Sequence, residues 1–335
     1  MKQYNTTIIG FGITGMLVFA ILKSENIDNI CIIDPYFDGG DLLRLWGDVL
    51  SNTSLQKTID ALKLINPTYV VPQTYAQYDV TKITPLYVLV FIIKDFLRQY
   101  QLCTTYETKV QTLEYNEVWT ITNEDGTSIQ SKTILCCQGS EVKKLQCGIP
   151  SISLNNALNK DILKKYIKPA DKVLVFGTAH SGALVLENLH NLGVETTAVY
   201  KGDKPFSFAS EGEYDGIKEE AERIGRSILD KKYNIQLIHL TNVEKIIKAS
   251  KEATWVIYAI GFESRSIKVF VNNKVVSLKL YDSKNGLLSE CPKAYGFGIA
   301  YPSLAPDNIH VDVGIYSFVE HIQKQIPNLK SILNR

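Results

Sequence analysis

The stretch TTIIGFGITG, residues 6–15, decides the fold of this chain. Its first four residues predict a short buried strand, and a helix is expected to follow the glycines. Each of the three glycines has a separate structural role. Gly10 permits a tight turn, Gly12 lets backbone approach a diphosphate, and Gly15 lets the helix pack on the strand. An anion would then lie at the helix N-terminus, where free N–H groups and the helix dipole favour negative charge.

An acid stands where such a unit needs one. The helix is expected from about Thr14 to Lys23, and the stretch NICIID at residues 29–34 reads as a second buried strand. Asp34 ends that strand 19 residues after Gly15 (34 − 15 = 19), close to the spacing of an acid that binds a ribose hydroxyl. Strand, turn, helix and acid in this order predict a dinucleotide-binding unit, and the alternative is a purely structural glycine turn.

The same pattern returns at residues 171–202, DKVLVFGTAHSGALVLENLHNLGVETTAVYKG. Ala179 replaces the middle glycine, so backbone approach is expected to be somewhat poorer. The second strand of this unit ends in Lys201 and carries no acid, which favours NADP over NAD because a lysine suits a 2′-phosphate. A solvated lysine is the alternative. His180 is expected either to contact phosphate or ribose or to lie on the surface.

The remaining segments complete an α/β chain. A helix with a proline near its start is expected at 84–102, and a β-meander at 105–138. A strand is expected at 254–261, short alternating stretches at 269–283, and a final helix from about Val313.

Composition excludes several classes of protein. The chain has 335 residues, 45% hydrophobic and 21% charged, with net charge +1 and pI about 7.5, so nucleic acid and acidic membrane surfaces are not expected partners. The six cysteines form no C-x-x-C and no zinc spacing, which fits a reducing cytosol. The start does not resemble a signal peptide, and the longest apolar run, 86–93, is too short to span a bilayer.

Two dinucleotide units in one chain imply two dinucleotides, one of them a flavin that receives hydride from the other. Here the sequence resembles the two-dinucleotide-binding flavoproteins of the pyridine nucleotide-disulfide reductase superfamily, most closely the flavin-containing monooxygenase-like branch. The likeness rests on GFGITG with Asp34, ILCCQGS (134–140, where Gly139 ends a hydrophobic strand), VFGTAHSG (175–182) and VIYAIGFES (256–264, with Gly261).

The resemblance implies FAD and NADPH as cofactors, and it implies site residues. Gly39-Gly40, Trp46 and the turn SNTS (51–54) follow Asp34 as they do in the monooxygenase branch, so Asn52 is expected to donate a hydrogen bond to the reacting oxygen or substrate. The alternative for Asn52 is a turn-capping side chain. The residues expected to bind the two cofactors are Gly10, Gly12, Ile13, Thr14, Gly15, Asp34, Pro35, Trp46, Val110, Gly139, Gly177, Ala179, His180, Ser181, Gly182, Lys201, Gly261, Gly298, Val313 and Gly314.

Two departures from the family bear on the chemistry. The monooxygenase fingerprint F-x-G-x-x-x-H-x-x-x-F/Y is absent, because residues 147–158 read CGIPSISLNNAL and contain no histidine. A redox C-x-x-C is also absent, which disfavours disulfide reduction. Cys136 and Cys137 lie on an apolar strand and are expected to pack in the core.

These observations predict two Rossmann-like three-layer ββα domains, with an NAD(P)H-binding domain (156–289) inserted into an FAD-binding domain (1–155 and 290–335). The favoured function is an FAD-dependent NAD(P)H oxidoreductase, monooxygenase-like, that passes hydride from NADPH to FAD and then electrons to O2 or a small-molecule substrate. A flavin oxidase or reductase without oxygen insertion and a non-catalytic FAD/NADP-binding redox sensor are the alternatives. A cytoplasmic location is expected, and a homodimer is compatible with the sequence.

Overall fold

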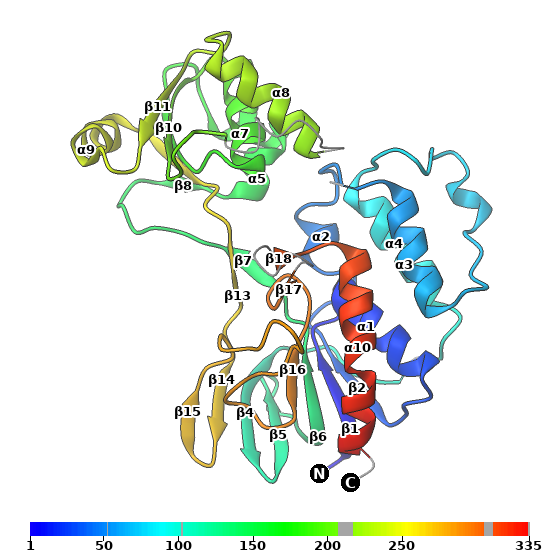
Figure 1. Cartoon of the computed structure of the whole chain (residues 1–335). Helices are drawn as coiled ribbons and strands as arrows, with labels where there is room; N and C mark the ends of the chain where they lie inside the picture. The colour runs from blue at the N-terminus through cyan, green and yellow to red at the C-terminus, as the bar shows by residue number, and fades with distance from the viewer. Residues whose placement is uncertain (52, 102, 207–216, 305–310, 334–335) are drawn as a thin grey trace. The chain divides into compact units, whose positions relative to one another are not determined.

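The computed structural model describes residues 1–51, 53–101, 103–206, 217–304 and 311–333. The chain divides into two compact units (Figure 1). The first unit comprises residues 1–47, 54–140 and 264–335, and the second comprises residues 48–53 and 141–263.

The first unit is built on a sheet with the strand order β15-β14-β4-β5-β6-β1-β2-β3, and β16 also pairs with β6. Strands β1, β2, β3, β6 and β16 run parallel, whereas β4, β5 and β6 form an antiparallel meander. The strands are β1 (Gln3–Ile9), β2 (Ile30–Ile33), β3 (Thr104–Tyr106), β4 (Val110–Asn116), β5 (Val118–Asn123), β6 (Ser128–Cys136), β14 (Lys268–Val271), β15 (Lys274–Val276) and β16 (Ala294–Gly296); β17 (Ser303–Leu304) pairs with β18 (Val311–Asp312) separately.

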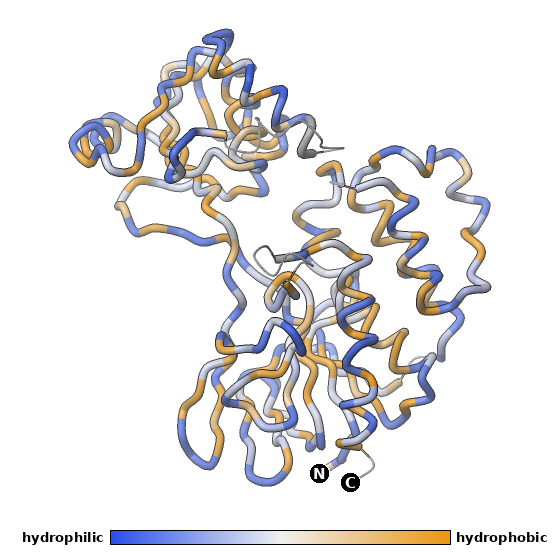
Figure 2. The backbone as a smooth tube through the Cα atoms, viewed as in Figure 1, coloured by the Kyte–Doolittle hydropathy of each residue, from blue (hydrophilic) through white to orange (hydrophobic). Residues whose placement is uncertain are grey.

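Two hydrophobic cores lie on opposite faces of the parallel strands. Ile8 and Ile32 face a core shared with the helices, while Ile9 and Ile33 face a core shared with the meander, because successive side chains of a strand point to opposite faces. The first unit therefore has the expected three-layer ββα arrangement. Hydrophobic residues occur along its helices and strands (Figure 2). Its helices are α1 (Ile13–Ser24), α2 (Asp41–Arg44), α3 (Leu55–Ile65), the 3-10 turn η1 (Gln73–Tyr75), α4 (Leu86–Leu97) and α10 (Ile315–Leu333).

The helix α4 is shorter than the sequence predicted. It begins after Pro85 and ends at Leu97, whereas the sequence predicted a helix over residues 84–102. Proline disfavours helical backbone in the residue before it, which fixes the start. Leu97 is followed by Arg98, Gln99 and Tyr100, and hydrogen bonds of the i→i+3 type replace the helical ladder there.

A buried histidine on α10 makes the stability of the first unit depend on pH. His321 is 6% exposed, and its Nε2 has no hydrogen-bond partner among the described residues. Burial lowers the pKa of His321 from its ordinary value of 6.5, and nearby Lys324 lowers it further, against a smaller opposing effect of Asp282. The unfolded chain therefore binds the proton first as pH falls.

We expect the free energy of unfolding to fall by up to about 1 kcal/mol between pH 6.5 and 5.5 because of His321 alone. This contribution is fully present above pH 6.5 and is lost as pH falls towards the depressed folded-state pKa. Urea unfolding at several pH values, compared between the wild type and His321→Leu, measures it. Equal pH dependence in both proteins would contradict the prediction.

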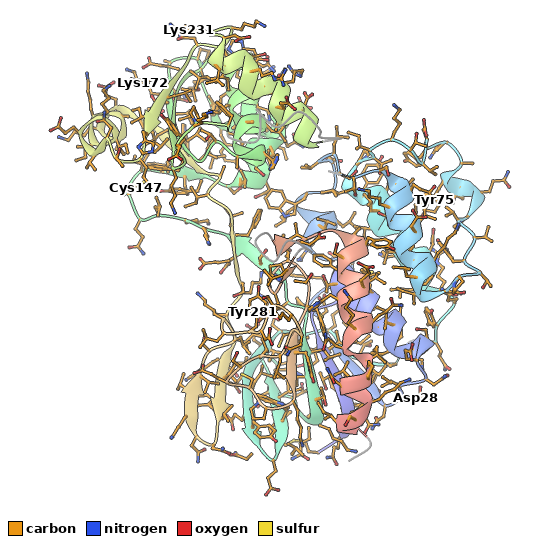
Figure 3. All side chains as sticks on the ribbon, in the orientation of Figure 1. Asp28, Tyr75, Cys147, Lys172, Lys231 and Tyr281 are labelled. Carbon is orange, nitrogen blue, oxygen red and sulfur yellow. The ribbon has the colours of Figure 1, made fainter. Side chains whose placement is uncertain are left out.

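The second unit is a five-stranded parallel sheet with the order β11-β10-β9-β12-β8. Its strands are β8 (Ser151–Ile152), β9 (Lys172–Phe176), β10 (Glu195–Tyr200), β11 (Ile235–His239) and β12 (Trp255–Tyr258), and its helices are α5 (Leu154–Leu158), α6 (Lys160–Tyr166), α7 (His180–Asn191), α8 (Ile217–Leu229) and α9 (Val243–Glu252). Lys172, labelled in Figure 3, joins the start of β9 to Glu195 and Glu252 through ion pairs of 3.1 and 3.0 Å.

The layering of the second unit differs from the expected ββα arrangement. Ile246 and Ala249 of α9 pack on Leu174 and Phe176 of β9, so a helix covers this face of the sheet where the first unit has its meander. The reason is local: Ile246, Ala249 and Ala253 recur at the i, i+3, i+7 spacing of one helix face, with no alternation of the strand type.

Two segments that pair with each other, β7 (Ser140–Val142) and β13 (Phe262–Ser264), carry the chain into and out of the main part of the second unit, residues 141–263. The division falls at 140/141 and 263/264, whereas the sequence analysis placed it at 155/156 and 289/290. The difference at the second crossing has a clear cause. Strand β14 pairs in parallel with β4, which makes residues 268–276 part of the large sheet of the first unit. Among the described residues, no helix is both long and apolar enough to cross a membrane.

Candidate functional site

The glycine turn after β1 has the close contacts that its sequence predicts. Gly10 has a φ of +93°, and a Cβ there would lie 2.5 Å from the carbonyl oxygen of Cys137. A Cβ on Gly15 would lie 2.0 Å from the carbonyl oxygen of Gly10. Both positions therefore require glycine, because backbone atoms fill the space that any other side chain needs.

The turn after β9 repeats this geometry. Gly177 has a φ of +102°, and a Cβ there would lie 2.2 Å from the carbonyl oxygen of Ala259. A Cβ on Gly182 would lie 2.3 Å from the carbonyl oxygen of Gly177. The two residues that precede the helices also match: Gly12 has φ −70° and ψ −170°, and Ala179 has φ −72° and ψ −171°. This extended backbone suits any residue, so alanine stands at 179 without strain.

Both helices begin with donors available to an anion. The first helical hydrogen bonds run from Met16 to Gly12 and from Ala183 to Ala179, so the preceding N–H groups lie at the open N-terminal ends. Neither helix has an acidic residue in its first turn or a side-chain cap. Gly12 and Thr14 are half-buried, whereas Ile13 points into the core and offers only its backbone. In the second turn Ala179 is exposed, and Ser181 is half-buried.

Asp34 is bound by backbone on both of its carboxylate oxygens. Oδ2 accepts a hydrogen bond from the Phe11 N–H at 2.7 Å, and Oδ1 accepts from the N–H groups of Tyr36 and Phe37, both at 2.9 Å. Asp34 is 8% exposed, and its carboxylate joins the glycine turn to the loop after β2. Pro35 begins that loop. The sequence analysis predicted that Asp34 binds a ribose hydroxyl, and it did not predict this structural role.

The loop between β2 and α2 folds over the glycine turn. Phe37, Gly39 and Gly40 all have left-handed backbone, with φ of 51°, 121° and 71°. A Cβ on Gly40 would lie 2.8 Å from the Cα of Gly12, so the two backbones are in close contact. Three left-handed positions within four residues, one of them the non-glycine Phe37, require firm support from neighbouring groups.

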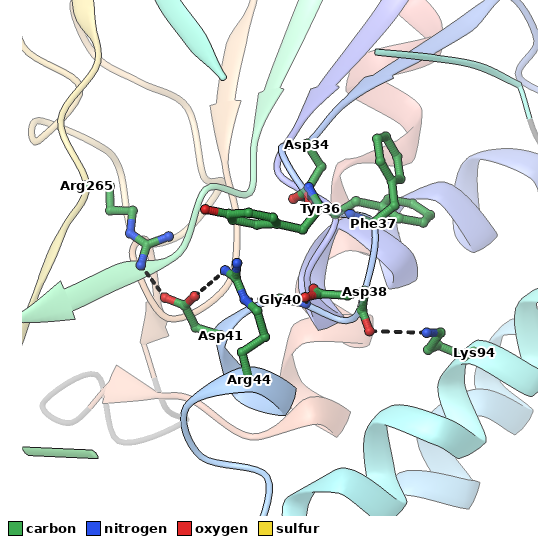
Figure 4. A network of polar contacts seen from close by, with 10 residues as sticks. Asp34, Tyr36, Phe37, Asp38, Gly40, Asp41, Arg44, Lys94 and Arg265 are labelled. Carbon is green, nitrogen blue, oxygen red and sulfur yellow. Dashed lines mark hydrogen bonds and ion pairs between the residues drawn. The ribbon is translucent and has the colours of Figure 1, made fainter. Parts of the chain in front are cut away.

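Charged side chains supply part of that support (Figure 4). Arg44 lies 3.8 Å above the ring of Tyr36 and forms an ion pair with Asp41 at 2.5 Å. Asp38 accepts the Gly40 N–H at 2.9 Å, and its carbonyl accepts a hydrogen bond from Lys94 at 3.1 Å. Trp46 follows α2 and is half-buried.

The carboxyl ends of β6 and β16 complete this edge of the sheet. Gly139 follows β6 with a φ of +71°, and Gly298 follows β16 with a φ of +84°. A Cβ on Gly298 would lie 2.2 Å from the Thr14 hydroxyl, so the returning chain lies against the first turn of α1. Because β1, β2, β6 and β16 are parallel, the residues after each strand meet at one edge, where ligands of open α/β sheets bind.

Gln138 is a residue at this edge that the sequence analysis did not select. Its Nε2 donates to the hydroxyl of Tyr301 at 2.7 Å, and its Oε1 is buried with no partner among the described residues. Burial raises the pKa of Tyr301 far above its ordinary value. A polar side chain directly after a buried strand is the signal that could have identified Gln138.

The adjacent thiols are packed in the core, as expected. Cys136 is fully buried and Cys137 is 5% exposed, and neither forms a disulfide. Burial raises the pKa of both thiols well above the ordinary value of 9.0, which disfavours the reactive thiolate form.

The start of α10 carries a carboxylate of its own. Asp312 Oδ1 accepts the Gly314 N–H at 3.0 Å, and its Oδ2 accepts the Ser317 hydroxyl at 2.5 Å. Val313 and Gly314 were expected to bind a cofactor. The Gly314 N–H is occupied by this cap, whereas Val313 is exposed. Val110 starts β4 with its side chain against the core, so a cofactor role there would fall to its backbone.

The remaining residues that were expected to bind a cofactor lie at the carboxyl edge of the second sheet. Lys201 follows β10 and is exposed, and the neighbouring Tyr200 ring meets His239 at 5.1 Å. His180 is half-buried at the first position of α7. Gly261 is exposed with a φ of +89° after β12. Each lies after a different parallel strand or at the helix start, which is the placement that a nucleotide site needs.

Asn52, the expected catalytic residue, lies outside the described residues. Among the residues that are described, no group of three or more His, Cys, Asp or Glu side chains could hold a metal ion.

No protein-family model and no curated protein sequence matches this chain. Solved structures do match it. A flavin-containing monooxygenase from Stenotrophomonas maltophilia has a TM-score of 0.63 at 14% identity, over 99% of both chains. A bacillithiol disulfide reductase from Staphylococcus aureus has a TM-score of 0.64 at 15% identity, over 100% of this chain and 99% of the other. A thioredoxin reductase from Lactococcus lactis has a TM-score of 0.56 at 15% identity, over 99% of both.

These likenesses define the fold. The chain has the architecture of the two-dinucleotide-binding flavoproteins, as the sequence motifs predicted.

Proposed function

We propose that this protein is an FAD-dependent NAD(P)H oxidoreductase, with FAD at the turn of residues 10–15 and NADPH at the turn of residues 177–182. The observation that carries the proposal is the repeated turn. Each turn has a left-handed first glycine, an extended N-cap residue, and a last glycine whose Cβ would lie 2.0 Å (Gly15) or 2.3 Å (Gly182) from the carbonyl oxygen of the first glycine. Solved structures of this fold include a steroid monooxygenase bound to NADP and a protein in complex with FAD and NADP.

The residues present fit both cofactors. The glycine turns form cradles that a Cβ would fill, and the helix N-termini present N–H donors to a diphosphate without a competing acid in the first turn. Bound FAD would supply the redox chemistry, taking hydride from NADPH and passing electrons to O2 or a small-molecule substrate. The chain's own part is to bind, orient and shield the two cofactors.

The finer activity is proposed as monooxygenase-like, on the likeness of the sequence to that branch. A flavin oxidase or reductase is the second candidate, and a specific observation favours it: residues 147–158 lack the histidine of the monooxygenase fingerprint. The non-catalytic sensor remains the third candidate.

An anaerobic absorption spectrum of the purified protein, before and after addition of NADPH, tests the proposal. A flavin spectrum that bleaches supports the hydride path, and admitting oxygen then separates oxygenated product from released peroxide. A bound flavin that does not bleach contradicts an NADPH-dependent enzyme. Absence of flavin after reconstitution with FAD contradicts the assignment of residues 10–15.

Lys201 is expected to set the preference for NADPH. We expect Lys201→Ala to raise the dissociation constant for NADPH about 10-fold, because a charged hydrogen bond to the 2′-phosphate is lost, and to leave NADH binding unchanged. Titration of both nucleotides measures this, with Lys204→Ala, another exposed lysine of the same loop, as the control. Equal losses for NADPH and NADH would contradict the assignment.

A further inference from the structure

Arg265 connects two segments at the carboxyl edge of the first sheet. Its guanidinium forms an ion pair with Asp41 Oδ2, while Asp41 Oδ1 pairs with Arg44 (Figure 4). Its backbone N–H donates to the Gly139 carbonyl at 3.3 Å, and its own carbonyl accepts from Gln138 Nε2 at 3.4 Å. The backbone of Arg265 is thus attached to the end of β6, and its side chain reaches the first residue of α2.

Asp41, the residue that Arg265 holds, is adjacent to a close backbone contact of the glycine turn. Asp41 directly follows Gly40, whose backbone lies against Gly12. The loop that ends there contains three left-handed residues, which need support from outside the loop. Asp34 supports its beginning through Phe11, and the pairing of Asp41 with Arg265 supports its end.

Charge gives Arg265 a second effect. The loop carries three carboxylates, Asp34, Asp38 and Asp41, and three cations contact it, Arg44, Lys94 and Arg265. Without Arg265 this set would have one net negative charge beside the place proposed for a diphosphate. A net negative charge on the loop would repel the negatively charged diphosphate, and this repulsion is strongest where water is partly excluded.

We propose that Arg265 is a positioning residue for the flavin site, which acts through Asp41 to hold the loop of residues 34–44 against the glycine turn and to offset its negative charge. The inference rests on the proposed binding of FAD at this turn. Arg265 itself need not touch the cofactor.

The test compares Arg265→Gln, Arg265→Lys, Asp41→Asn and the double variant Arg265→Gln/Asp41→Asn. We expect Arg265→Gln to weaken FAD binding roughly 5- to 10-fold, since a partly exposed ion pair within a network is removed. Lysine should restore most of the affinity because it keeps the charge. The double variant should bind FAD no worse than Arg265→Gln, because both changes remove the same interaction. Arg98→Gln is the matched control, since Arg98 forms an exposed pair with Asp95 on α4.

Hydrogen exchange of the flavin-free protein gives a readout that does not need FAD. Amides of residues 36–44 should exchange faster in Arg265→Gln than in the wild type, and amides of α7 should not change. If residues 36–44 exchange faster in Arg265→Gln and the wild type binds no FAD, the positioning role of Arg265 is retained and the proposed function is overturned. Unchanged exchange together with unchanged FAD affinity would overturn the role of Arg265.

Discussion

Gly15→Ala is expected to unfold the first unit or to leave it without flavin. The added methyl would stand 2.0 Å from the carbonyl oxygen of Gly10, and this neighbour is backbone that cannot rotate away. Relief requires α1 to move off β1, which breaks contacts of fully buried residues such as Leu17 and Val18. We expect a loss of about 3 kcal/mol or more in the free energy of unfolding. Urea unfolding followed by circular dichroism measures it.

Gly12→Ala is the matched variant, because it adds the same methyl to the same turn. The nearest atom to that methyl would be the Cα of Gly40 at 3.8 Å, an ordinary contact, and the backbone at Gly12 is extended. Stability should change by less than about 0.5 kcal/mol. FAD affinity should fall about 10-fold, since the methyl projects where the diphosphate approaches. If both variants lose stability equally, the packing role of Gly15 is wrong; if Gly12→Ala binds FAD normally, the cofactor does not approach this backbone.

The contrast between these glycines shows which features the sequence could predict. The order of strand, turn, helix and strand follows from local spacing, so residues 6–15 and 171–202 were sufficient to predict both turns. Gly10 and Gly177 could be assigned for the same reason, because their left-handed backbone is a local requirement of the turn.

Features that depend on distant residues could not be predicted in this way. Strand β14 joins the first sheet only because it pairs with β4, which precedes it by more than 150 residues, and no local pattern at 268–271 records that partner. The pairing of Arg265 with Asp41 is similarly remote in sequence. The role of Asp34 was missed for another reason: a fingerprint specifies an acid, and the backbone N–H groups around it decide what the acid binds.

Gly182→Ala is expected to leave FAD bound while it disables reduction by NADPH. The new methyl would stand 2.3 Å from the carbonyl oxygen of Gly177, so α7 must shift on β9. The first unit has its own cores and sheet, and its flavin spectrum should therefore persist. We expect the rate of flavin reduction at a fixed NADPH concentration to fall about 100-fold, because small misplacements of a hydride donor have effects of this size. Anaerobic stopped-flow absorbance measures the rate.

Ala179→Gly is the control, since it removes a methyl from the same turn where the backbone is already extended. NADPH should bind this variant at least as tightly as the wild type, and flavin reduction should continue. Reduction of Gly182→Ala at the wild-type rate would show that NADPH does not bind at this turn. Loss of flavin from Gly182→Ala would show that the two units depend on each other for folding. Retained flavin with slow reduction is the result that assigns one dinucleotide to each turn.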